Sequence, residues 1–98
     1  MSSDERLFIV TYDIADPKRW RRVFKAMHGY GEWLQLSVFQ CRLSRRRRAE
    51  LETQLRALVK PGEDHVLLID VGPADRIELA VESIGRVFTK IERQATVI

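Results

Sequence analysis

The sequence has little cysteine and no long apolar run. Its single Cys41 cannot close an internal disulfide, and a thiol inside an apolar segment is typical of a small buried hydrophobic residue. No apolar stretch approaches the ~20 residues of a membrane span. Residues 1–6 are acidic and polar and lack the basic and apolar regions of a signal peptide. We therefore expect a protein of a reducing compartment, the cytoplasm, with no membrane partner.

The common catalytic and cofactor motifs are absent as well. The sequence contains no G-x-G-x-x-G, no Walker loop, no H-E-x-x-H and no paired C-x-x-C. Its two histidines, His28 and His65, are isolated, and no general base stands out. The sequence therefore gives no support for a nucleotide-binding loop or for one of the common zinc sites.

Composition and charge indicate one soluble domain with a tendency to bind phosphate. A chain of 98 residues, 45% hydrophobic and 32% charged, can bury a single core, so we expect one domain over residues 1–98. The net charge of +3 is modest, but 13 of the 17 basic residues are arginine, whose fork of donors suits phosphate. The candidate nucleic-acid-binding residues are Arg19, Arg21, Arg22, Arg45, Arg46, Arg47 and Arg48.

The run Arg45–Arg48 has two possible roles. These cations follow a presumed helix N-cap, where the helix dipole disfavours positive charge. A phosphate backbone could satisfy both the helix N–H groups and the arginines, but a solvated charge run explains the pattern equally well. No aromatic residues are interleaved, which argues against base stacking.

Residues 7–14 form the segment around which the chain is organised. Residues 7–10 are continuously apolar, which is typical of a strand covered on both faces. Aspartate is depleted in strands, so Asp13 at the far end is either a turn-former or a ligand. Asp16 and Pro17 then read as the N-cap and first residue of a helix with an apolar stripe on one face, which Gly29 and Gly31 stop.

The segment 32–43 has strand character, but its apolar phase shifts between Val38 and Phe39. Because side chains alternate with period two, a break or bulge near 35–38 is required if both sets are buried. A hairpin there gives a ferredoxin-like core, whereas one bent strand gives a small open α/β sheet. Periodicity leaves both alternatives open.

The second half of the chain predicts another helix and three β-prone segments. Ser44 is a candidate N-cap for a helix ending at Pro61-Gly62, and residues 65–71 form a continuous apolar strand. Strict alternation over 77–82 predicts a half-exposed strand, and the tail 86–98 ends in a β-prone apolar run that we expect to pair with something. The expected fold is an α+β, ferredoxin-like βαββαβ sandwich with an extra C-terminal strand.

Several segments together resemble the CRISPR-associated protein two family of prokaryotic adaptive immunity. Residues 10–14, VTYDI, are similar to the V-x-Y-D-I strand end of that family, and residues 16–19, DPKR, to its helix entry. Residues 30–31, YG, followed by QLSVF at 35–39, resemble its Y-G…Q-x-S-V-F segment. The SIG at 83–85 resembles a later strand end.

The resemblance implies a homodimer. We expect the tail 86–98 to be exchanged between its subunits, because the apolar end of the tail has no partner left in its own chain. The resemblance further implies that one Asp13 from each subunit holds a shared divalent metal, Mg²⁺ or Mn²⁺. Family members are described as metal-dependent endonucleases on RNA or double-stranded DNA, and as the non-catalytic centre of a complex with the CRISPR integrase. The positions that match family site or substrate positions, besides Asp13, are Tyr12, Arg19, Arg21, Ser37 and Phe39.

The chemistry of the residues agrees with the metal. Mg²⁺ commonly takes one or two carboxylates plus waters, so a two-fold pair of Asp13 residues is a plausible site where one alone is weak. Three hypotheses follow: a metal-dependent phosphodiesterase, a DNA-bridging scaffold for the integrase, or a virulence-associated toxin ribonuclease of the same fold.

Overall fold

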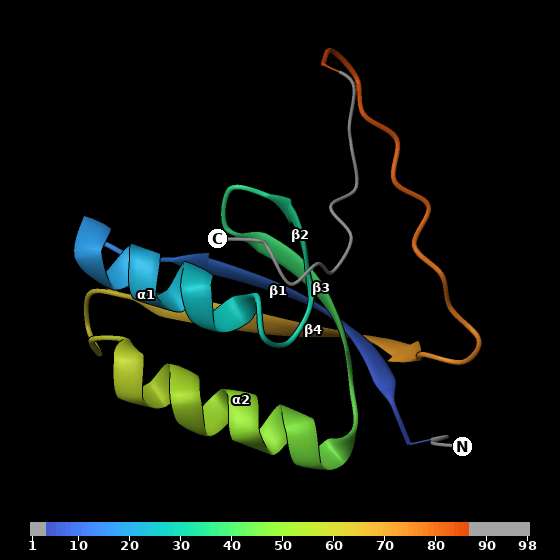
Figure 1. Ribbon diagram of the computed structural model, residues 1–98, viewed down its shortest axis with the longest axis horizontal. Helices are drawn as coiled ribbons and strands as arrows, with labels where there is room; N and C mark the ends of the chain where they lie inside the picture. Colours follow the sequence, from blue (N-terminus) through green and yellow to red (C-terminus); the bar gives the residue numbers. More distant parts are fainter. Residues whose placement is uncertain (1–3, 87–98) are drawn as a thin grey trace.

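The computed structural model describes residues 4–86, which form an α+β arrangement of four strands and two helices (Figure 1). The elements are β1 (Arg6–Asp13), α1 (Pro17–Met27), β2 (Glu32–Gln35), β3 (Val38–Leu43), α2 (Arg45–Leu58) and β4 (His65–Pro73). The strands form one antiparallel sheet in the order β2-β3-β1-β4. The expected α+β class is confirmed.

Strand β1 occupies the centre of the sheet, between β3 and β4. Phe8, Val10 and Tyr12 alternate toward the helices and join the main core. Leu7 has the other parity and is still 0% exposed, whereas Asp13, with that same parity, is exposed. The prediction of a strand covered on both faces therefore holds only for its beginning. Its end carries Asp13 to the face opposite the helices.

Segment 32–43 is a hairpin, so the single bent strand is wrong. Gln35 pairs with Val38, and Leu36 between them has φ +41° and is 73% exposed. The apolar alternation shifts phase at this turn, because the residues between Gln35 and Val38 belong to neither strand. Phe39, on the far side of the turn, is therefore buried.

Both helices begin where their caps predict. The Asp16 Oδ2 accepts a hydrogen bond from the Arg19 N–H at 2.9 Å, and Pro17 opens α1. The Ser44 Oγ accepts from the Arg47 N–H at 3.1 Å. The helices pack on one face of the sheet, and the core residues that they contribute are Val23, Met27, Leu51 and Leu55. Cys41 is buried among them, as expected, and burial raises the pKa of its thiol to about 12.

The strand predicted over 77–82 is not formed. Strand β4 ends at Pro73, and Figure 1 shows the following segment, in orange, leading away from the sheet. Arg42 holds its start, with Nη1 donating to the Ala74 carbonyl at 2.7 Å. Alternation supplies a face but no backbone partner, and residues 77–82 pair with neither edge strand of the described sheet, β2 or β4. The paired tail predicted over 86–98 lies almost entirely in residues 87–98, outside the described residues.

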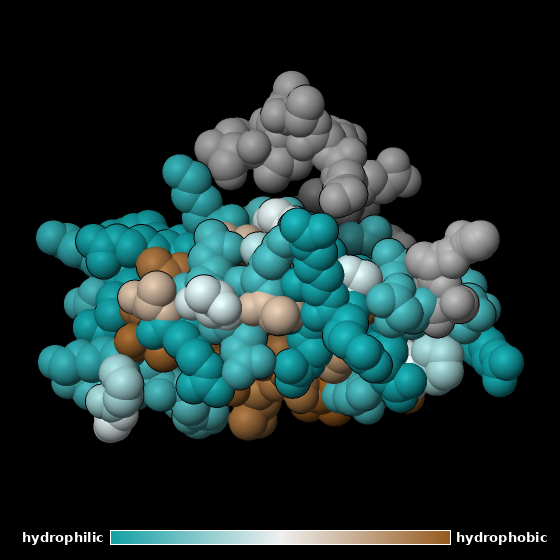
Figure 2. All heavy atoms as spheres, turned by 90° about the horizontal axis from the view of Figure 1, so that it is seen from below, coloured by the Kyte–Doolittle hydropathy of each residue, from teal (hydrophilic) through white to brown (hydrophobic). Residues whose placement is uncertain are grey.

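The surface on the side of α2 is largely hydrophilic, and hydrophobic residues gather along one margin of that view (Figure 2). Neither described helix is long and apolar enough to cross a membrane. The cytoplasmic location stays a prediction.

Candidate metal and nucleic-acid site

Asp13 is the last residue of β1 and is exposed. It shares its parity with Ile9 and Thr11, so its side chain belongs to the sheet face that the helices leave open. Across the β1–β4 ladder its partner is His65, the first residue of β4. A carboxylate in this position is accessible to a ligand approaching the open face.

One copy of the chain supplies an incomplete metal site. No group of three or more His, Cys, Asp or Glu residues that could hold a metal occurs within residues 4–86. Asp13 provides the oxygen donor that Mg²⁺ and Mn²⁺ accept, but Mg²⁺ needs octahedral ligation that one carboxylate cannot complete. The donor type fits the expected metal, and the missing ligands would have to come from water and a second copy.

Strand β4 presents an apolar stripe on the same open face. Leu67, Ile69 and Val71 are 50%, 47% and 37% exposed. Leu67 and Ile69 pair with Thr11 and Ile9 of β1, so the stripe continues from the strand that carries Asp13. Large apolar side chains side by side on an uncovered sheet face are typical of a protein interface.

Tyr12 and Phe39, both predicted as site residues, lie in the core on the helix side of the sheet. Their ring centroids are 6.4 Å apart, and Tyr12 also packs against Trp20 at 6.3 Å. The Tyr12 hydroxyl is buried without a hydrogen-bond partner among the described residues, and desolvation raises its pKa well above the usual range. The structure does not bring these two rings together with Asp13.

Ser37 lies in the β2–β3 turn beside the end of β1. Its Oγ accepts a hydrogen bond from Trp20 Nε1 at 2.8 Å, and its carbonyl accepts from the Tyr12 N–H at 3.2 Å. These contacts tie α1 and the turn to the residue that precedes Asp13. Ser37 therefore holds the strand end in place.

Arg19 is committed to two acidic residues of the α2–β4 loop. Its Nε lies 2.8 Å from Asp64 Oδ2 and its Nη2 lies 3.0 Å from Glu63 Oε1. The Asp64 side chain is 0% exposed, and Arg19 lowers the pKa of that carboxyl well below its usual range. Arg21 and Arg22 are exposed on α1 and form no ion pair with any residue from 4 to 86. Of the arginines around α1, these two present free guanidinium groups.

Asp64 was not singled out from the sequence, although it organises the loops around Asp13. Besides Arg19, its carboxylate accepts from the Ala15 N–H at 2.9 Å and from the Lys60 N–H at 2.8 Å. An acidic residue shortly after a helix-ending Pro-Gly pair was the available signal. That signal does not reveal which distant loop the carboxylate will bind.

The arginines at the start of α2 are largely neutralised by their own helix. Arg46 and Arg47 pair with Glu50 at 3.6 and 3.3 Å, and Arg48 pairs with Glu52 at 3.2 Å. Arg45 has no acidic partner within the described part of the chain.

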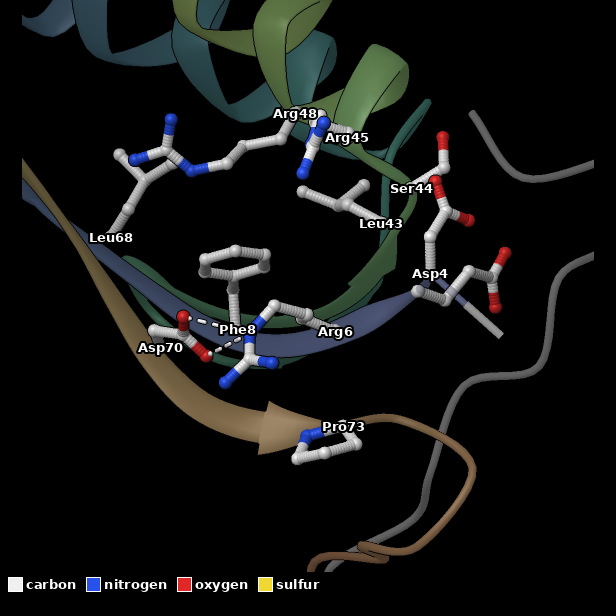
Figure 3. Close-up of a pocket in the computed structure, with 11 residues that line it drawn as sticks. Asp4, Arg6, Phe8, Leu43, Ser44, Arg45, Arg48, Leu68, Asp70 and Pro73 are labelled. Atoms are coloured by element: carbon white, nitrogen blue, oxygen red, sulfur yellow. Dashed lines mark hydrogen bonds and ion pairs between the residues drawn. The ribbon is translucent and has the colours of Figure 1, made fainter. Parts of the chain in front are cut away.

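A pocket of about 490 Å³ lies between the start of α2, the start of β1 and the end of β4 (Figure 3). Arg45 and Arg48 point from the helix toward it, and the Arg48 guanidinium lies 5.5 Å from the centre of the Phe8 ring. Arg6 and Asp70 form an ion pair of 2.9 Å on its other side. Asp70 is thus a surface partner of Arg6.

This pocket and Asp13 lie at opposite ends of β1. Arg6 begins the strand and Asp13 ends it, so they are about 24 Å apart at the usual rise of a strand. The structure therefore separates the predicted nucleic-acid-binding residues into two groups. Arg21 and Arg22 lie on α1, which follows Asp13, and Arg45–Arg48 lie at the far end.

The fold and the site define a small α+β protein that exposes one strand-end carboxylate and an apolar stripe on an uncovered sheet face. Residues 6–76 match the family model described as CRISPR associated protein Cas2, and the chain belongs to this family.

Relatives and solved structures agree with this assignment. The chain is 56% identical over 97 residues to the CRISPR-associated endoribonuclease Cas2 1 of Rhodospirillum rubrum, covering 99% of this chain and 95% of the relative. It is 53% identical over 94 residues to the CRISPR-associated endoribonuclease Cas2 of Geobacter sulfurreducens, covering 96% and 99%. A crystal structure of cas2 superimposes with a TM-score of 0.72 at 35% identity, covering 90% and 95%. The crystal structure of a hypothetical protein from Thermus thermophilus superimposes with a TM-score of 0.72 at 32% sequence identity, covering 87% of this chain and 99% of that one.

Proposed function

We propose that this protein is a metal-dependent endonuclease of CRISPR adaptive immunity, which hydrolyses phosphodiester bonds of single-stranded RNA or double-stranded DNA. The observation that carries the proposal is the position of Asp13, exposed at a strand end on the open face of the sheet. Relatives more than 50% identical over nearly the whole chain are named endoribonucleases. The family match also favours this function over that of a toxin ribonuclease.

The active form is a homodimer of ferredoxin-like subunits in which each contributes one Asp13. The apolar stripe of Leu67, Ile69 and Val71 supports this, because covering it with a second copy removes exposed apolar surface from water. Two copies related by a two-fold axis present the same patch to each other and bring equivalent residues together. A pair of Asp13 carboxylates then supplies the two protein ligands that Mg²⁺ commonly takes.

The roles of the residues follow from their surroundings. When bound, the ion would lower the pKa of a coordinated water and neutralise charge developing on the phosphate. Asp13 holds the ion. Arg21 and Arg22, exposed and without acidic partners among residues 4–86, attract the phosphate backbone. Arg19 holds the loop after Asp13 through Asp64 and does not need to contact substrate.

Cleavage assays of Asp13→Ala test this function. Single-stranded RNA and duplex DNA are incubated with the wild-type protein in Mg²⁺, in Mn²⁺ and in a chelator. We expect cleavage that depends on the metal and is lost in Asp13→Ala, and that persists in Asp75→Ala, which removes another exposed aspartate. Equal cleavage by wild type and Asp13→Ala would move the site elsewhere, and cleavage in the chelator would refute metal dependence.

A second function is favoured by the separation of the two basic groups. Because Arg45–Arg48 lie at the end of β1 distant from Asp13, they can hold DNA without engaging the carboxylate. We infer that the dimer also serves as a non-catalytic scaffold for the CRISPR integrase during spacer acquisition. Spacer integration in cells that carry Asp13→Ala tests this. Integration at the wild-type frequency is expected, and its loss in a correctly folded variant would tie both functions to Asp13.

A further inference from the structure

Asp13 and His65 form the last pair of the β1–β4 ladder, where β1 ends and β4 begins. Residues directly opposite in an antiparallel pair project to the same face, with Cβ atoms about 5 Å apart. Both residues are exposed. The fold therefore places an imidazole beside the only carboxylate of the proposed metal site, although the two residues are 52 positions apart in the chain.

The backbone on both sides of this pair is held by one buried carboxylate. Asp64 directly precedes His65, and its Oδ1 accepts a hydrogen bond from the N–H of Ala15, two residues after Asp13. Its Oδ2 binds Arg19 Nε at 2.8 Å and the Lys60 N–H at 2.8 Å. Ligands held by surrounding hydrogen bonds are already organised before a metal binds. Here such hydrogen bonds fix the backbone on either side of the Asp13–His65 pair.

The other histidine has a different environment. His28 packs edge-on against Phe24 and Phe39, with ring centroids 4.7 and 5.2 Å apart. It thus belongs to the aromatic layer under α1, on the helix side of the sheet. Of the two histidines in the sequence, only His65 lies on the face of Asp13.

We propose that His65 is a metal ligand of the same site as Asp13. Each subunit then supplies one carboxylate oxygen and one imidazole nitrogen, and a dimer supplies four protein ligands. Imidazole nitrogen suits first-row transition ions, whereas Mg²⁺ is bound through oxygen. The site therefore favours Mn²⁺ over Mg²⁺ through His65. This inference rests on the proposed metal site at Asp13.

Binding of the metal alone tests the ligand without an activity readout. Mn²⁺ and Mg²⁺ are titrated by calorimetry into the full chain and into the variants His65→Ala, Asp13→Ala and His28→Gln. We expect His65→Ala to weaken Mn²⁺ binding by about tenfold or more and to leave Mg²⁺ binding within about twofold. Asp13→Ala should lose both ions, and the control His28→Gln should keep both.

Pulsed electron paramagnetic resonance of bound Mn²⁺ provides the direct signature. A nitrogen coupled to the ion is expected in wild type and in His28→Gln, and its disappearance is expected in His65→Ala. Wild-type Mn²⁺ affinity in His65→Ala, together with loss in Asp13→Ala, would overturn the histidine ligand and leave the proposed function standing. A wild-type protein that binds neither ion would overturn the metal site and the histidine ligand together.

Discussion

Arg19 and Asp64 join the start of α1 to the loop before β4 through an Nε–Oδ2 contact of 2.8 Å in which the Asp64 side chain is fully buried. The resemblance to the family predicted Arg19 to be a site or substrate residue. In this structure its guanidinium is occupied by Asp64 and Glu63. Loss of activity in an Arg19 variant would therefore report a displaced loop as readily as a lost substrate contact.

The first prediction separates these two roles of arginine on α1. Arg19→Ala should lower the melting temperature, because it leaves Asp64 buried and charged without its partner. Arg21→Ala should leave the melting temperature within about 1–2 °C, since exposed side chains without partners contribute little to stability. Thermal unfolding by circular dichroism measures both. Equal melting temperatures for Arg19→Ala and wild type would return Arg19 to a direct role with substrate.

The second prediction concerns acid stability. The pKa of Asp64 lies below its ordinary value of 3.8, because Arg19 and the Ala15 and Lys60 amides hydrogen-bond the charged form. The unfolded state therefore binds the proton more readily, so the stabilisation is complete above about pH 4 and is lost as the pH falls below it. Urea unfolding from about pH 6 to pH 2 should show this loss.

The variant Asp64→Asn removes the titrating group. Its free energy of unfolding should be lower than wild type at neutral pH and should fall less steeply as the pH drops below about 4. Asp75→Asn, an exposed aspartate, serves as the control and should keep the wild-type shape. An unchanged acid limb in Asp64→Asn would show that other carboxylates govern acid unfolding.

The third prediction tests the buried tyrosine. Tyr12→Phe removes a hydroxyl that has no partner within the described residues, so the free energy of unfolding should stay unchanged or rise by up to about 1 kcal/mol. Phe39→Ala empties a fully buried ring position and should cost about 3–5 kcal/mol. Because the Tyr12 ring lies on the helix side of the sheet, metal-dependent cleavage should survive Tyr12→Phe. Loss of cleavage without loss of stability would give the hydroxyl a direct role.

The fourth prediction concerns the arginine run at the start of α2. Each phosphate that a protein neutralises on duplex DNA contributes about 0.9 to the slope of log affinity against log salt. Arg45 has no acidic partner among residues 4–86, whereas Arg46, Arg47 and Arg48 each pair with a glutamate of their own helix. Changing all four to Gln should reduce the slope by about 1–2 units per subunit, and Arg45→Gln alone should account for about 0.9 of it.

Duplex binding titrated across a range of salt concentrations measures these slopes. Arg46→Gln is the matched control, because Arg46 is the sequence neighbour of Arg45 and equally basic, but it already pairs with Glu50. A slope that stays constant in the quadruple variant would mean that the run is only a solvated face.

Local sequence determined the helices of this protein and most of its core. Asp16 with Pro17 and Ser44 mark helix starts because a capping side chain satisfies N–H groups only two or three residues away. The apolar stripe of α1 likewise reveals its buried side, since burial follows from a periodicity that is written in the sequence. The continuous apolar run 65–71 predicts a strand but does not show which of its faces is left exposed. The strand-end position of Asp13 was available in the same way.

Tertiary structure decided what depends on a partner distant in the chain. The phase shift after Val38 required a break, but only the packing of β3 against β1 made it a hairpin turn. The alternation over 77–82 predicted a strand, yet a strand also needs a backbone partner, and this segment pairs with neither edge strand of the described sheet, β2 or β4. The burial of Asp64 beneath two loops and the pairing of His65 with Asp13 depend on register between β1 and β4. Register is set by the whole sheet, so no local pattern in the sequence contains it.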